Sequence, residues 1–150
     1  METGLELRHQ VCFALYTASR AMTDLYREVL DELGLTYPQY LVLLALWERP
    51  ADPPTVTELG QALQLDSGTL SPLLKRMAAG GLVSRERASR DERQVQIHLT
   101  TQGQAMRQRA AQVPVKVATA TGLTLDQLIE LRHTLTTMTE HIHRTKGRRP

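Results

Sequence analysis

The chain has little cysteine, few aromatic residues and almost no net charge. One cysteine in 150 residues excludes a disulfide within the chain and a metal site built from several cysteines. A net charge of +2 does not indicate a polyanionic partner, so contact with nucleic acid would need local clusters of basic residues. No run of about 18 apolar residues is present, which argues against a membrane-spanning helix. The start lacks a signal-peptide pattern, and we expect a cytoplasmic protein.

The aromatic residues are confined to the first third of the chain. The six are Phe13, Tyr16, Tyr26, Tyr37, Tyr40 and Trp47. Cys12 directly precedes the first of them. If the protein has a ligand pocket, we expect it in this N-terminal part, because the rest of the chain relies on aliphatic side chains.

At 150 residues the chain has the length of one domain, and residues 65–100 are its most informative stretch. Asp66 occupies an N-cap position and Gly80-Gly81 provides a stop, which predicts a helix between them. Pro72 lies inside this helix and should kink it or remove a hydrogen bond. The apolar residues follow the spacing of one buried helix face: Leu70, Leu73, Leu74 and Met77.

Two short alternating runs follow, at residues 82–87 and 94–99, with a polar stretch at 88–93 between them. This pattern predicts a β-hairpin. A helix that fits a DNA groove, followed by a hairpin with arginines at its tip, is a winged helix-turn-helix. For the charges alone, an ordinary solvated hairpin remains an equally good interpretation.

The flanking segments are helical in pattern. An apolar stripe predicts a first helix over residues 5–33, and Tyr37-Pro38 opens a buried second helix through Trp47. We expect a further helix that meets Pro114 and ends by Gly122. We expect the basic tail at 144–150 to be frayed. Three Thr-x-x-Glu/Gln pairs mark helix starts: Thr55 and Glu58, Thr101 and Gln104, and Thr124 and Gln127. The predicted fold is mainly α with a small β-hairpin wing.

Several motifs resemble the multiple antibiotic resistance regulator (MarR) family, in particular its organic hydroperoxide resistance branch. They are residues 11–16 (VCFALY), 35–41 (LTYPQYL), 66–70 (DSGTL), 91–93 (DER) and 99–100 (LT). The match covers roughly residues 5 to 105. The resemblance implies one winged helix-turn-helix domain over 1–150 that forms a homodimer and acts as a repressor. Its dimerisation helices would be 5–48 and 101–145, and its DNA-binding head 55–100.

Cys12 is the candidate sensor. Tyr16 lies one turn away and is expected to support a thiolate at Cys12. Tyr26 lies roughly 21 Å along the expected helix and cannot touch the thiol of its own subunit. The resemblance implies that Tyr26 and Tyr37 of the other subunit reach this sulfur. A thiolate would attack an organic hydroperoxide and become a sulfenic acid. A buried core cysteine is the alternative that spacing alone favours.

The chain departs from those relatives that carry a second, C-terminal cysteine. Oxidised Cys12 would therefore form a mixed disulfide with a low-molecular-weight thiol, cyclise to a sulfenamide, or over-oxidise. Nearby apolar side chains would favour an alkyl or fatty-acyl peroxide. These side chains are Phe13, Leu15 and Trp47.

The expected DNA partner is a double-stranded inverted repeat. The candidate contacts are Ser67, Thr69 and Ser71 in the major groove, Lys75 and Arg76 at phosphates, and Arg90 and Arg93 at the adjacent minor groove. Asp91 is expected to shape the wing. A salt bridge between Arg93 and Asp91 that only shapes the wing is the alternative role for Arg93.

Three rival functions remain open. The effector could be a small aromatic or phenolic ligand held between helices, as in many relatives. A thiol peroxidase is less favoured, because no resolving cysteine is present. A metal sensor would rest on His141 and His143 alone, which more often are surface histidines. We expect neither enzymatic activity nor a bound metal or cofactor.

Overall fold

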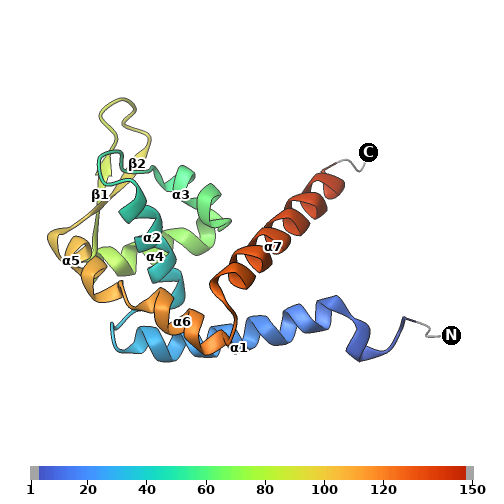
Figure 1. The fold of residues 1–150 in the computed structure, drawn as a ribbon. Coiled ribbons are helices and arrows are strands. Elements are labelled where there is room, and N and C mark those ends of the chain that lie inside the picture. Colours follow the sequence, from blue (N-terminus) through green and yellow to red (C-terminus); the bar gives the residue numbers. More distant parts are fainter. Residues whose placement is uncertain (1–3, 148–150) are drawn as a thin grey trace. The chain divides into compact units, whose positions relative to one another are not determined.

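The computed structural model describes residues 4–147, shown in Figure 1. The chain divides after Ala111 into two compact units. The elements are helical except for one two-stranded sheet, as the sequence predicts. Within the described residues, no helix is both long and apolar enough to cross a membrane.

The first unit begins with a short 3₁₀ helix, η1 (Leu7–His9), and then α1 (Val11–Asp31). The prediction of one helix over 5–33 is wrong at its start, because the backbone of Gln10 is extended (φ −85°, ψ 114°) and separates the two helices. The side-chain amide of Gln10 donates to the carbonyls of Gly4 and Glu6, which stabilises this turn. Cys12 is therefore the second residue of α1.

The core of this unit is built around α2 (Tyr37–Glu48). Thr36 and Gln39 form a capping box at its start, with Pro38 in the first turn. The indole of Trp47 donates to the carbonyl of Gly103 at 3.1 Å. One side of the helix is buried, and Leu41, Leu44 and Ala45 on the remaining side are half-buried, which agrees with its apolar composition. The buried residues are Tyr40, Val42, Leu43, Leu46 and Trp47.

The helix-turn-helix consists of α3 (Val56–Leu63) and α4 (Ser67–Ala79). The Thr55 and Glu58 capping box forms as predicted, and the carboxylate of Asp66 accepts from the backbone N–H of Thr69 at 2.8 Å. Pro72 lies inside α4 without ending it. The expected core face is confirmed, with Leu70, Leu73, Leu74 and Met77 buried.

The wing is an antiparallel pair, β1 (Val83–Arg87) and β2 (Val95–Leu99), with Val83 opposite Leu99. The turn that leads into it needs a glycine, because Gly81 has φ +78°. At the far end, the backbone N–H of Ala88 donates to the carbonyl of Gln94 at 2.8 Å. Both strands lie within one residue of their predicted bounds.

Helix α5 (Thr101–Ala110) packs against the base of the wing. Its N-cap is Thr100, not Thr101 as the sequence pattern predicts, because the Thr100 hydroxyl accepts from the N–H of Gly103 at 3.0 Å and donates to the carbonyl of Gly81. A Cβ at Gly103 would lie 2.1 Å from the carbonyl oxygen of Leu82. Only glycine allows this close approach.

The second unit contains α6 (Val113–Thr121) and α7 (Leu125–Lys146). The prediction of one helix from Thr101 to Gly122 is wrong, because a break precedes α6 and Pro114 lies in its first turn, where no N–H is needed. The capping box of Thr124 and Gln127 is confirmed. Helix α7 continues through residues 144–146, whereas residues 148–150 of the expected frayed tail lie outside the described residues.

Candidate DNA-binding and redox sites

The outer face of α4 carries the residues proposed to contact DNA. Ser67, Thr69, Lys75 and Arg76 are exposed, and Ser71 is half-buried. They lie on the face away from the buried leucines, so their side chains are available to a partner. The hydroxyls can donate to or accept from base edges, and the cations can bind phosphates.

The tip of the wing carries Arg90, Asp91 and Arg93, all exposed. The carboxylate of Asp91 accepts from the backbone N–H of Arg93 at 3.0 Å, and its carbonyl accepts from the N–H of Gln94. Among the described residues, no ion pair joins Arg93 to Asp91. Asp91 therefore shapes the turn through the backbone, which leaves the guanidinium of Arg93 accessible.

Cys12 is exposed in this chain, so it is not a core residue of the fold. It lies in the first turn of α1, where no side chain caps the helix. Tyr16, one turn along α1, is 59% exposed and lies under the guanidinium of Arg20, 5.6 Å from the ring centroid. Trp47, one of the expected apolar neighbours, is instead buried against α5.

Tyr26, Tyr37 and Tyr40 form a tyrosine cluster at the opposite end of α1. The ring centroids of Tyr26 and Tyr37 are 4.6 Å apart, and those of Tyr26 and Tyr40 are 6.1 Å apart. The pKa of Tyr26 is raised, chiefly by burial and to a lesser extent by the charge interaction with Tyr37 and Tyr40. The pKa of Tyr40 is raised, chiefly by burial and to a lesser extent by the charge interaction with Tyr37. These two hydroxyls therefore stay protonated near neutral pH. That of half-buried Tyr26 is available as a hydrogen-bond donor, whereas Tyr40 is buried in the core.

The structure does not bring Cys12 and the tyrosine cluster together within one chain. Both Cys12 and Tyr26 lie on the continuous helix α1, separated by about 21 Å at 1.5 Å per residue. The family resemblance identifies Tyr26 and Tyr37. The sequence pattern misses Tyr40 as a third member, which the capped start of α2 positions beside them. It also misses the first-turn location of Cys12, because the extended backbone of Gln10 leaves no pattern in the sequence.

A groove opens beside the end of α2. It has a volume of about 970 Å³ and is lined by the end of α2, the following loop, β2 and α5, with no aromatic residue among its walls. Helix α2 buries Tyr40 and Trp47 in the core. A ligand pocket in the aromatic N-terminal third stays a prediction. Among the described residues, no group of three or more His, Cys, Asp or Glu could hold a metal ion.

Comparison with known proteins places this architecture in a family. A family model described as transcriptional regulator SarA/Rot matches residues 24–109. The organic hydroperoxide resistance transcriptional regulator of Bacillus subtilis is 43% identical over 139 residues, which cover 93% of each protein.

Solved structures agree with this placement. Reduced AbfR bound to DNA is 37% identical, covers 91% of this chain and 94% of its own, and has a TM-score of 0.74. AbfR is also known in an overoxidised form bound to DNA and in a disulfide form. MarR of E. coli is 28% identical, with coverage of 86% and 96% and a TM-score of 0.69. The chain therefore belongs to the MarR family of winged-helix, DNA-binding transcriptional regulators, in the organic hydroperoxide resistance regulator branch.

Proposed function

We propose that the protein is a repressor that releases its operator when an organic hydroperoxide oxidises Cys12. The observation that carries this proposal is the position of the cysteine. It is exposed, in the first turn of a helix, in a chain similar to a hydroperoxide resistance regulator. AbfR, another relative, is known in reduced, overoxidised and disulfide forms, which supports a redox role for the cysteine.

A second subunit would complete the sensor. The family is dimeric, and α1 is too long for its own tyrosine cluster to reach Cys12. Large apolar side chains near Cys12 remain uncovered in the single chain, and a partner would bury them: Leu5, Leu7, Val11, Phe13 and Tyr16. Tyr37 is 41% exposed, so its hydroxyl is accessible to a neighbouring chain.

The chemistry begins with the thiolate of Cys12. Its sulfur attacks the terminal peroxide oxygen, the O–O bond breaks, and the departing alkoxide takes a proton and leaves as an alcohol. The hydroxyls of Tyr26 and Tyr37 would stabilise the thiolate by donating to the sulfur. The sulfenic acid then condenses with a low-molecular-weight thiol, with loss of water. The mixed disulfide adds bulk beside the dimer interface and moves the two DNA-binding heads apart.

On DNA, the dimer would bind an inverted repeat with one α4 in each major groove. Ser67, Thr69 and Ser71 would contact base edges, and Lys75 and Arg76 would contact phosphates. Arg93, with Arg90, would enter the adjacent minor groove from the wing.

Gel shifts with an operator fragment test this proposal. Cumene hydroperoxide should release the wild-type protein, whereas Cys12→Ser should stay bound with unchanged affinity in the reduced state. Mass spectrometry after stoichiometric peroxide and a small thiol should show one adduct per chain. Release of Cys12→Ser by peroxide, or an unmodified Cys12 in the released protein, would contradict the proposal. Release of both proteins by a phenolic ligand instead would favour the ligand-sensing alternative.

A further inference from the structure

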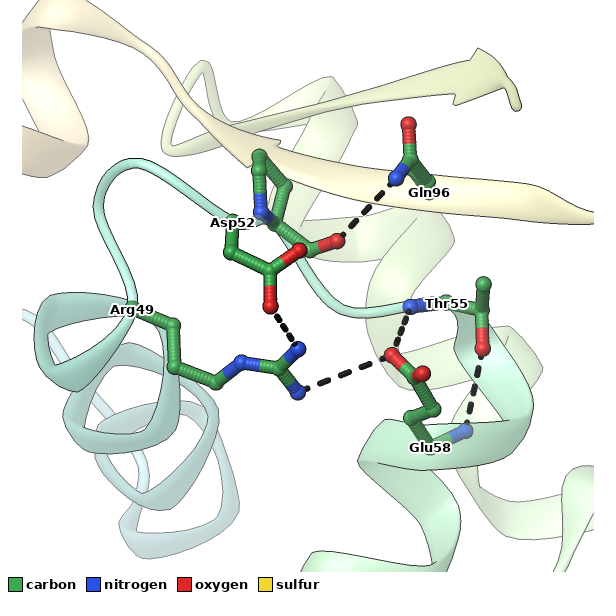
Figure 2. Close-up of polar contacts among 6 residues, drawn as sticks. Arg49, Asp52, Thr55, Glu58 and Gln96 are labelled. Carbon is green, nitrogen blue, oxygen red and sulfur yellow. Dashed lines mark hydrogen bonds and ion pairs between the residues drawn. The ribbon is translucent and has the colours of Figure 1, made fainter. Parts of the chain in front are cut away.

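Five polar residues at the junction of α2, α3 and β2 form what we call the α2–α3 polar cluster, shown in Figure 2. They are Arg49, Asp52, Thr55, Glu58 and Gln96. Arg49 directly follows α2 and forms an ion pair with Asp52 in the loop. Its Nη1 lies 3.6 Å from Oε2 of Glu58 in the first turn of α3. One guanidinium therefore binds carboxylates on both sides of the loop.

Glu58 has two functions in this cluster. Its Oε2 accepts from the backbone N–H of Thr55 at 3.0 Å, while its own N–H donates to the Thr55 hydroxyl at 3.2 Å. The same oxygen that caps α3 is the one that Arg49 approaches. The start of α3 is thus joined to the end of α2 through a single carboxylate.

The loop is also joined to the wing. The side-chain amide of Gln96 donates to the carbonyl of Pro53 at 3.2 Å, and the backbone N–H of Ile97 donates to the carbonyl of Pro54 at 2.9 Å. Thr55 and Gln96 form an antiparallel bridge. These contacts join the loop to β2, and so link the start of α3 to the wing.

Beneath the cluster, α2, α3 and β2 pack through apolar side chains, with Leu46, Leu59 and Ile97 buried. A groove of about 970 Å³ opens on the outer side, with Arg49, Pro50 and Pro53 among its walls. Close-packed side chains limit the angle between two elements, and on the groove side the polar contacts add to that packing. Because α1 packs on α2, the angle at this junction relates the DNA-binding head to the helices that carry the dimer.

We propose that Arg49 and Glu58 are positioning residues for DNA recognition, which set the half-site spacing that the dimer accepts. Their ion pair fixes α3 and the wing relative to α2 in each subunit. Two heads held at fixed angles fit only one separation of half-sites along the duplex. The proposal uses the DNA binding and dimerisation of the family and does not depend on oxidation of Cys12.

The test compares Glu58→Gln and Arg49→Gln with the wild type. The glutamine at position 58 can still accept from the Thr55 N–H, so the helix cap is retained while the charge pair is removed. Asp52→Asn is the matched control, because Asp52 is 76% exposed and joins Arg49 only to its own loop. Affinities are measured for an inverted repeat selected in vitro with the wild-type protein. The same affinities are measured for versions of this repeat whose spacer is changed by one or two base pairs, and for DNA that carries a single half-site.

We expect the preference for the selected spacing to fall by about fivefold in both variants, since an exposed ion pair is weak but each dimer contains two. The affinity for the single half-site should stay within about twofold of wild type, and Asp52→Asn should behave as wild type. An unchanged spacing preference would overturn the proposal. So would an equal loss on every DNA, half-site included, because Glu58 would then act only as the cap of α3.

Discussion

The rings of Tyr26 and Tyr37 lie 4.6 Å apart, although one comes from the last turns of α1 and the other from the first residue of α2. This contact brings two phenol groups to one place on the surface of the chain. If they serve the cysteine of a second subunit, each should contribute separately to its reactivity.

Replacing Tyr26 with Phe should slow oxidation of Cys12 by about tenfold. The reason is that a hydrogen bond to a charged group contributes about 1.5–3 kcal/mol. The measurement is stopped-flow trapping of the sulfenic acid under stoichiometric cumene hydroperoxide. Tyr40→Phe serves as the control, because Tyr40 is buried and belongs to the core. Equal rates of Cys12 oxidation in wild type and Tyr26→Phe would show that Tyr26 does not support the sensor cysteine.

The tyrosine cluster also predicts how stability changes at alkaline pH. Folding raises the pKa of Tyr26 and of Tyr40, chiefly through burial, so the native state holds these protons more tightly than the unfolded chain. The free energy of unfolding should therefore be insensitive to these groups below about pH 10. It should fall as the pH rises from there through the raised native values. Urea unfolding curves across this range should show that Tyr26→Phe loses less of its free energy of unfolding than the wild type. An identical loss in both proteins would be evidence against a raised pKa of Tyr26 in the native state.

Gly103→Ala should destabilise the protein by about 2–4 kcal/mol. The new methyl group would lie 2.1 Å from the carbonyl oxygen of Leu82, so α5 or the base of the wing would have to move. Chemical denaturation measures the effect. Gly80→Ala is the comparison, because a Cβ there would first meet the Arg76 carbonyl at 3.4 Å, an ordinary contact. Similar losses of stability in the two variants would mean that the close approach at Gly103 is relieved without cost.

Lys75 and Thr69 should have different effects on DNA binding, although both are exposed on α4. Lys75→Gln should weaken binding alike on all sequences and reduce the slope of log affinity against log salt by about 0.9 for each phosphate that is no longer neutralised. Thr69→Ala should leave the slope unchanged and relax the preference at particular base pairs. Fluorescence anisotropy titrations at several salt concentrations separate the two. A sequence-dependent weakening in Lys75→Gln would reassign this residue to base recognition.

The sequence predicts most of the winged helix because its signals are local. Asp66 caps α4, Glu58 completes the box of Thr55, and the leucines of α4 follow one helical face. Such contacts span one or two turns and can therefore be inferred from spacing. The same holds for the wing, whose polar turn separates two alternating runs.

The features that the sequence does not reveal depend on contacts between distant segments or on small changes of backbone. Thr100 rather than Thr101 caps α5, because its hydroxyl also reaches the carbonyl of Gly81. Gln10 interrupts the first helix through bonds that its side chain makes to the preceding turn. The ion pair between Arg49 and Glu58 crosses a proline-rich loop that has no periodicity. None of these follows from propensity alone.

The uncovered apolar side chains at the start of the chain, with Leu5 84% exposed and Val11 of α1 64% exposed, have a consequence for how the regulator responds to its own abundance. If burial of this surface by a second subunit forms the species that binds DNA, the concentration of that species in dilute conditions varies with the square of the chain concentration. Operator occupancy would then rise more steeply than gene dosage, and a modest drop in synthesis would lower it even without any oxidant.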